Sequence, residues 1–141
     1  MKGEILALLA ALLWGIAPIF DKIVVSSGVS PYMANLIRAF GAITFLALAV
    51  LLFKKFDLSA FTNKNLVYLL VAGALGGGLA MIMYYVALKF THASKVVPLT
   101  SIYPLFTVVF SAIVLGEDVS PKVVVGTILI ILGVVLVCGE G

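Results

Sequence analysis

Charged side chains are scarce in this sequence. Only 11% of its 141 residues are charged, nine basic and six acidic, whereas 64% are hydrophobic. The mean hydropathy is +1.30. A soluble domain carries about 25% charged residues, and a chain of this length needs them to cover its surface. The composition therefore excludes an ordinary soluble globule and indicates that most of the surface faces lipid.

Cysteine and histidine are nearly absent as well. Cys138 and His92 are the single residues of their types, so an intrachain disulfide and a Cys/His metal cluster are excluded. We expect no metal and no cofactor. No pair of carboxylates shares a mid-membrane face, and no Ser, His and acid have credible spacing. The Gly73–Gly78 cluster lacks the Lys-Ser/Thr ending of a phosphate-binding loop. We therefore expect no enzymatic activity.

Basic residues are in slight excess, with a formal net charge of +3. They are scattered singly apart from Lys54-Lys55, and they form no stripe with interleaved aromatic residues. This pattern argues against nucleic acid as a partner. The basic residues are better explained as determinants of membrane orientation.

Long hydrophobic runs dominate what is present. A helix needs about 20 apolar residues to cross a bilayer, and five such runs are separated by charged or turn-forming residues. Gly28 with Ser30-Pro31, and Gly116 with Ser120-Pro121, are typical stop and restart signals. The break between Lys89 and Lys95 contains neither Gly nor Pro. The sequence predicts an all-α integral membrane protein with spans at Gly3 to Val25, Ser30 to Phe53, Asn65 to Lys89, Ala93 to Leu115 and Lys122 to Gly139.

Small and polar residues lie on one face of each of the first four spans. Lipid gives no reason to collect such residues, so these faces should point inward. The stripes are Ala7, Ala10, Ala11, Trp14, Pro18 and Asp21; Asn35, Arg38 and Ala42; Gly73, Gly77, Ala80, Tyr84 and Ala87; and Thr100, Pro104, Thr107 and Ser111. They either pack helices together or line a cavity. We assign helix packing to Gly73, Gly77, Gly126 and Gly133, because small residues allow close backbone approach.

Arg38 lies about two turns inside the second span, where a cation costs about 2.5 to 3.5 kcal/mol on insertion scales. Two explanations stay open: Arg38 pairs with Asp21 of the first span, or it faces a wet cavity and recognises a carboxylate or phosphate. Asp21 lies nearer the end of its span, so it is either that partner or an interfacial carboxylate beside Lys22.

Prolines and deep aromatic residues add to the cavity hypothesis. Pro18, Pro98 and Pro104 each remove a backbone hydrogen bond within an apolar span, and lipid cannot satisfy the carbonyl that is freed. Such bends belong beside a cavity or buried protein, although a simple packing kink is the alternative. Trp14, Tyr84, Tyr85 and Tyr103 lie too deep for an interfacial belt. The candidates for the substrate cavity are Trp14, Pro18, Asp21, Arg38, Tyr84, Thr100, Tyr103, Pro104, Thr107 and Ser111.

The order of short motifs resembles one EamA-type repeat of the drug/metabolite transporter superfamily. Trp14-Gly15 followed by Lys22, and Arg38 in the second span, are similar to the start of that repeat. The later blocks are similar too: Tyr85-Val86-Ala87-Leu88-Lys89, Ala93-Ser94, Pro104, Leu115-Gly116-Glu117 and Gly126 to Gly133. The resemblance implies that residues 1–141 form one five-helix domain, half of a ten-helix inverted-repeat transporter with a central substrate cavity.

Lysine counts bear on the missing half. One side of the membrane receives Lys2, Lys54, Lys55, Lys64 and Lys122, and the other receives Lys22, Lys89 and Lys95, which is five against three. Counting Arg38 on its nearer side gives five against four. So weak a bias is compatible with insertion in both orientations, and equally with a single orientation that places Lys54-Lys55 in the cytoplasm.

We therefore expect a multi-pass protein of the cell membrane that moves a small metabolite or drug-like solute by alternating access. Its expected partners are the lipid bilayer, the small-molecule substrate, and either a second copy, including an antiparallel dimer, or a homologous repeat protein. The alternative is a non-transporting scaffold or accessory subunit of a larger complex. A continuous polar cavity would favour transport over this alternative.

Overall fold

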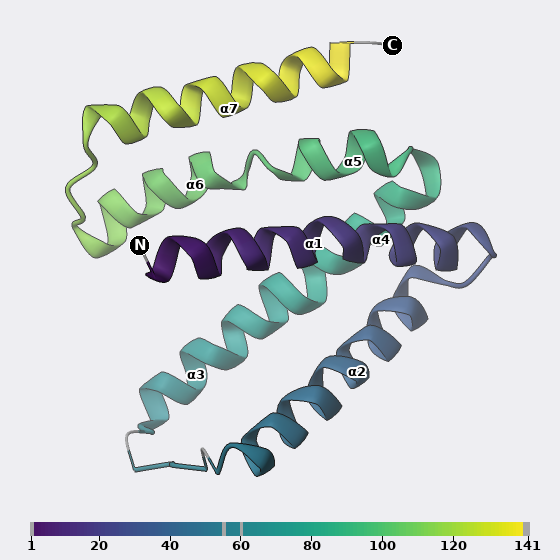
Figure 1. Cartoon of the computed structure of the whole chain (residues 1–141), viewed down its shortest axis with the longest axis vertical. Helices are drawn as coiled ribbons and strands as arrows, with labels where there is room; N and C mark the ends of the chain where they lie inside the picture. Colours follow the sequence, from purple (N-terminus) through teal and green to yellow (C-terminus); the bar gives the residue numbers. More distant parts are fainter. Residues whose placement is uncertain (1, 55, 60, 140–141) are drawn as a thin grey trace. The chain divides into compact units, whose positions relative to one another are not determined.

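The computed structural model describes residues 2–54, 56–59 and 61–139. The described part is helical and contains no strand (Figure 1). Its elements are α1 (Lys2–Ser26), α2 (Pro31–Leu52), α3 (Asn63–Ala72), the π-helix η1 (Gly73–Leu79), α4 (Ala80–Phe90), α5 (Ala93–Thr100), α6 (Tyr103–Phe110), the π-helix η2 (Ser111–Leu115) and α7 (Pro121–Gly139).

These elements make five helical stretches that are long and apolar enough to cross a membrane. They are Gly3–Ser26, Pro31–Leu52, Asn63–Phe90, Ala93–Leu115 and Pro121–Gly139. The all-α fold class with five membrane helices is thus confirmed, and each boundary lies within two residues of its prediction. The chain is an integral multi-pass membrane protein.

Helix boundaries follow the expected turn chemistry. Gly28 and Gly116 have φ of 93° and 66°, a left-handed conformation that glycine adopts without a steric penalty. Pro31 begins α2, where its missing N–H is not needed. Thr62 caps α3, its side chain accepting a hydrogen bond from the Asn65 N–H. The break without Gly or Pro lies at Thr91 and His92, between α4 and α5.

The longest connection, between α2 and α3, carries the carboxylate Asp57. Its Oδ1 accepts a hydrogen bond from the Ser59 N–H at 2.8 Å. Hydrogen bonds from the side chain and backbone of Ser59 lower the pKa of the Asp57 carboxyl below its ordinary value. Lys55, which contributes to the predicted charge bias, lies outside the described residues.

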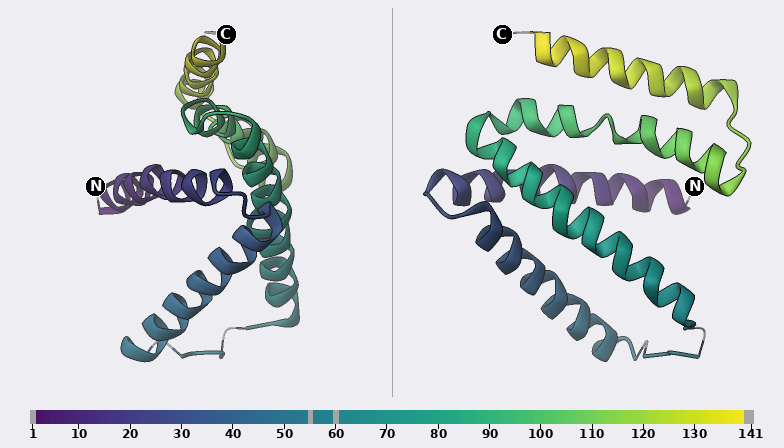
Figure 2. Two further views of the ribbon diagram at one scale, coloured as in Figure 1. Left: turned by 90° about the vertical axis from the view of Figure 1, so that its right-hand side faces the viewer. Right: turned by 180° about the vertical axis from the view of Figure 1, so that it is seen from behind.

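The chain divides into two compact units, Met1–Phe90 and Thr91–Gly141. In the first unit, α4 packs against α1 and α2. Figures 1 and 2 show that these three helices approach one another where α1 ends, α2 begins and α4 ends, and diverge toward their other ends. Val25, Ala34, Tyr85 and Leu88 are buried in this unit. We call this region the helix junction.

In the second unit, α7 packs against both α5 and α6. The fourth span is interrupted at Ser101 and Ile102, and Pro104 lies in the first turn of α6. The bend expected near Pro104 is therefore present as a break. Proline fits the first turn of a new helix and disfavours continuation of the preceding one.

Candidate functional site

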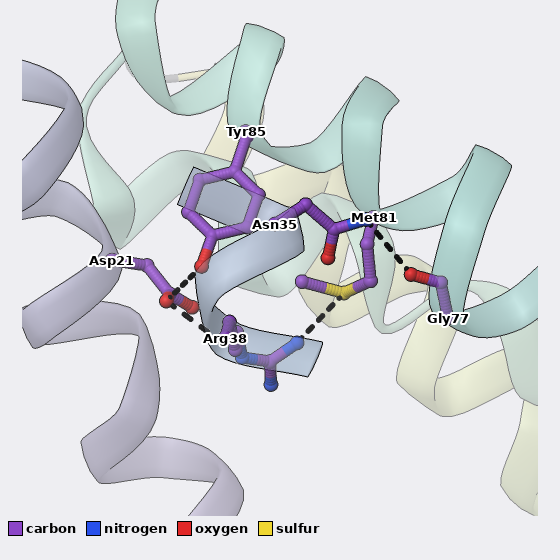
Figure 3. A network of polar contacts seen from close by, with 6 residues as sticks. All are labelled: Asp21, Asn35, Arg38, Gly77, Met81 and Tyr85. Atoms are coloured by element: carbon purple, nitrogen blue, oxygen red, sulfur yellow. Dashed lines mark hydrogen bonds and ion pairs between the residues drawn. The ribbon is translucent and has the colours of Figure 1, made fainter. Parts of the chain in front are cut away.

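Polar side chains from three helices meet at the helix junction (Figure 3). α1 contributes Asp21, α2 contributes Asn35 and Arg38, and the helix running from η1 into α4 contributes Met81 and Tyr85. Most of the large apolar side chains elsewhere in the first unit are exposed, as expected for lipid-facing helices. The polar residues are thus gathered at the best-buried point of the unit.

Asp21 and Tyr85 form the buried centre of this group. The Tyr85 hydroxyl donates to Asp21 Oδ1 at 2.5 Å. Tyr85 is only 2% exposed and Asp21 only 8%. A buried carboxylate needs such a donor because the surroundings do not solvate it. The bond joins α1 to α4 across 64 positions of sequence.

Arg38 approaches Asp21 from α2. Its Nε lies 3.8 Å from Asp21 Oδ1, and its side chain is 41% exposed. Its Nη1 donates to the Met81 sulfur at 3.3 Å. The Asp21 pairing that the sequence left open is therefore present, in a loose form. The exposed fraction of the guanidinium leaves room for the second alternative, recognition of an anion.

Asn35 connects α2 to the π-helical turn. Its Nδ2 donates to the carbonyls of Gly77 at 2.9 Å and Gly78 at 3.4 Å. The Ala80 N–H bonds to Leu75 O, five residues back, as in a π-helix. Widened turns of this kind offer carbonyls to side-chain donors. The amide of Asn35 thus stabilises η1 against α2.

Lys22 completes the junction. Its Nζ donates to the carbonyl of Leu88 at 2.5 Å. Leu88 lies in the last turn of α4, where carbonyls have no partner within the helix. A lysine placed there satisfies one such carbonyl and complements the negative end of the helix dipole.

An open groove of about 570 Å³ runs between α2 and the α3–η1 segment. Asn35 brings an amide to a lining that is otherwise largely apolar. The lining is Tyr32, Asn35, Leu36, Ala39, Leu69, Leu70, Gly73, Ala74, Gly77, Gly78 and Ile82. Gly73 and Gly77 border this groove, and none of the residues predicted for the substrate cavity does.

The predicted cavity residues of the first unit are dispersed around the junction. Asp21 and Arg38 belong to it. Pro18 is buried one turn before Asp21, whereas Trp14 is 67% exposed. The Tyr84 hydroxyl is buried and has no hydrogen-bond partner among the described residues; its ring meets the Tyr85 ring edge-on, with centroids 6.1 Å apart.

In the second unit, the hydroxyls of the predicted stripe bond to their own helix. Thr100 donates to Val97 O at 2.8 Å, Thr107 to Tyr103 O at 3.2 Å and Ser111 to Val108 O at 3.2 Å. Such bonds satisfy a hydroxyl in lipid as well as beside a cavity. Tyr103 is exposed and Pro104 partly exposed. The role of this stripe in transport stays a prediction.

The glycines predicted to pack helices have open surroundings. A Cβ atom added at Gly73, Gly77, Gly126 or Gly133 would meet no atom within 4 Å. The assignment of these glycines to helix packing stays a prediction. No group of three or more His, Cys, Asp and Glu side chains that could hold a metal ion occurs within the described ranges.

The sequence analysis placed Asn35 on the inward stripe of the second span and Tyr85 among the deep aromatic residues, but it included neither of them among the cavity candidates, and it did not single out Met81. Asn35 carries a usable signal, since an amide inside an apolar span needs partners and the Gly76-Gly77-Gly78 run offers bare backbone. A regular helical period selects Tyr84 rather than Tyr85 for the inward face, because it does not allow for the change of phase that η1 makes between α3 and α4.

Comparison with known proteins places this geometry in context. The model of the EamA-like transporter family matches residues 1–139. An uncharacterized protein of Methanocaldococcus jannaschii is 31% identical over 132 residues, which cover 94% of this chain and 93% of that protein.

Two longer relatives are uncharacterized transporters. That of Archaeoglobus fulgidus is 26% identical over 145 residues, covering 100% of this chain and 50% of the transporter. That of Clostridium kluyveri is 31% identical over 140 residues, covering 96% of this chain and 44% of the transporter. The chain spans about half the length of these two transporters. No solved structure matches the chain.

Proposed function

This chain belongs to the EamA-like transporter family, and from that premise we propose that it moves a small metabolite or drug-like solute across the cell membrane by alternating access. Residues 1–141 act in this proposal as one five-helix domain. The observation that carries it is the group formed by Asp21, Arg38 and Tyr85 at the helix junction. Ionisable residues inside a membrane span are retained for ion pathways, ligand binding or specific pairing.

A five-helix repeat needs a second half to enclose a path. The two transporters are about twice as long as the matched region, and most of the large apolar side chains of α1, α2 and α3 are exposed. The second half is either another copy in the opposite orientation or an inverted homologous repeat. In both cases the faces of the two halves cover one another.

The residues of the fourth span enter the proposal on their sequence pattern. Thr100, Tyr103, Pro104, Thr107 and Ser111 combine hydroxyls, a deep aromatic ring and a broken helix. This combination resembles the interrupted helices that line midplane binding sites. The break between Thr100 and Tyr103 supports their inclusion.

Reconstitution of the full chain into liposomes tests the proposal. A screen for solutes that raise its thermal stability comes first, followed by uptake of each stabilising solute. Arg38→Leu should abolish uptake while the protein still inserts. Lys64→Gln, which removes a positive charge outside the helix junction, is the matched control and should transport normally. A chain that no solute stabilises and that moves none would contradict transport and favour an accessory subunit.

A further inference from the structure

The guanidinium of Arg38 has donors that the described residues do not satisfy. It carries five N–H donors in a rigid planar fork. Its Nε is 3.8 Å from Asp21 Oδ1, beyond the hydrogen-bonding range of about 3.2 Å. Its Nη1 bonds to the Met81 thioether, a weak acceptor. Within the described part of the chain, the fork has no oxygen acceptor at hydrogen-bond distance.

Asp21 is positioned to offset the charge of Arg38 without filling this fork. The same Oδ1 that faces Arg38 accepts the short hydrogen bond from Tyr85. That bond ties Asp21 to α4, and in this arrangement Asp21 does not form the paired, two-bond contact that Arg and carboxylate groups prefer. Arg38 therefore keeps a nearby counter-charge and a partly exposed side that can accept a ligand.

The depth of Arg38 makes this side significant. Arg38 lies seven residues after Pro31, which is about 10 Å along α2 from its first residue. A guanidinium at that depth requires oxygen acceptors, because lipid tails provide none. Carboxylate and phosphate groups match the fork geometry and carry the complementary charge.

We propose that Arg38 binds an oxyanion, a carboxylate or phosphate group, and that the transported solute is an anion. This assignment rests on the proposed function and names its substrate class. The ligand would take the place of the Met81 sulfur beside the guanidinium, while Asp21 would limit its affinity by like-charge repulsion and so favour release. A phospholipid headgroup offers the same chemistry, so the test separates the two sources.

Arg38 is the single arginine of the sequence, which makes a site-specific measurement possible. Phenylglyoxal modifies arginine side chains, and the modification is followed by mass on the peptide that contains Arg38. The full chain is labelled in alkyl maltoside micelles, which contain no phosphate, at constant ionic strength in chloride. Acetate and inorganic phosphate are the anionic probes, and acetamide is the neutral counterpart of acetate.

Acetate or phosphate at about ten times its dissociation constant should slow the labelling of Arg38 about tenfold, because only the unoccupied guanidinium reacts, whereas acetamide should not slow it. Asp21→Asn should lower the acetate concentration needed for protection, because it removes the competing carboxylate. Asp118→Asn, which also removes one negative charge but lies in the loop between η2 and α7, should leave the protection curve unchanged and so exclude a general charge effect.

Three outcomes would overturn the assignment. Rapid labelling that neither anion slows means that the site binds no oxyanion. Slow labelling in chloride alone means that the protein itself satisfies the fork. Protection by added phospholipid but by neither anion assigns Arg38 to a headgroup. Liposome uptake is read separately. Uptake of a neutral or cationic solute without anion protection contradicts this inference and leaves transport standing. Anion protection without uptake leaves the oxyanion site at Arg38 standing and contradicts both transport and the assignment of an anionic substrate.

Discussion

The Tyr85 hydroxyl donates to Asp21 at 2.5 Å, and this bond joins two membrane helices that are 64 positions apart in sequence. Its neighbour Tyr84 carries a hydroxyl that is also buried but has no partner in the described part of the chain. Of these two adjacent buried hydroxyls, one is hydrogen-bonded and the other is not. They form a matched pair for measuring what the bond contributes.

Tyr85→Phe should lower the free energy of unfolding by about 1 to 3 kcal/mol, because it leaves a buried carboxylate without its donor. Tyr84→Phe should be neutral or slightly stabilising, since it removes an unsatisfied buried hydroxyl. Thermal unfolding in detergent compares the two variants. Equal losses of stability in the two variants would show that the Asp21–Tyr85 hydrogen bond does not contribute to the free energy of unfolding.

Lys22→Met should loosen the end of α4. The substitution keeps much of the apolar stem but removes the donor to Leu88 O, so a carbonyl in the last turn loses its partner. Amide hydrogen exchange should increase at the α4 end and in the turn that follows. The control is Lys89→Met, which replaces an exposed lysine in the last turn of α4 itself. It should change hydrogen exchange much less. Similar exchange in both variants would contradict the role given to Lys22.

Asn35→Leu should destabilise η1. The variant is close in size to the wild type but cannot donate to the Gly77 and Gly78 carbonyls, and we expect a loss of about 1 to 3 kcal/mol. Thr44→Val is the control in the same helix, because the Thr44 hydroxyl bonds within α2 to Phe40 O. If the two variants unfold at the same temperature, Asn35 does not hold the π-helical turn.

Thr107→Val tests the predicted stripe of the fourth span. Its hydroxyl bonds to its own helix, so its loss should change stability by less than about 1 kcal/mol. The proposed transport role predicts a clear fall in uptake in liposomes. Thr127→Val removes a hydroxyl with the same type of bond in α7 and should leave uptake unchanged. Normal uptake by Thr107→Val would remove this residue from the transport path.

Membrane orientation can be measured directly. After Cys138 is replaced, a cysteine introduced between residues 56 and 59 should be labelled from both sides of intact cells if the active unit contains two copies in opposite orientations. Two lysines added near the loop after Val25 should favour one orientation, and two added near Lys54 should favour the other.

Each biased variant alone should then transport poorly, and their co-expression should restore uptake. Labelling of the wild-type chain from one side, together with full transport when it is expressed alone, would exclude the antiparallel pair of identical chains.

The membrane spans could be predicted from the sequence because a bilayer imposes one requirement on every helix. Each span needs about 20 consecutive apolar residues. Each helix must also begin and end at residues that favour a helix start or stop. Gly116 and Pro121 illustrate this: both lie where the structure ends one helix and begins another. Even the break at Thr91 and His92 lies within the polar segment that the hydropathy indicated.

The contacts within the spans were harder to predict. A regular period of 3.6 residues places Tyr84 on the same face as Gly77, whereas the structure brings Tyr85 to Asp21. A π-helical turn accommodates an additional residue, which shifts the following face by about 100° if it is fully absorbed. The sequence Gly73 to Leu79 contains no signal that specifies such a turn, apart from an excess of glycine. Arg38 and Asp21 were recognisable because unpaired charges are costly in lipid.

α1, α2 and α4 converge near Asp21 and Tyr85, so a small rotation of a helix about this point would move its distant end the most. Glu4 lies 17 residues before Asp21 on α1, a lever arm of about 25 Å. A rotation of α1 by only about 5° at the helix junction would move Glu4 by about 2 Å. A rotation that followed the exchange of a single polar contact at the helix junction would therefore produce its largest displacements at the helix ends farthest from that junction.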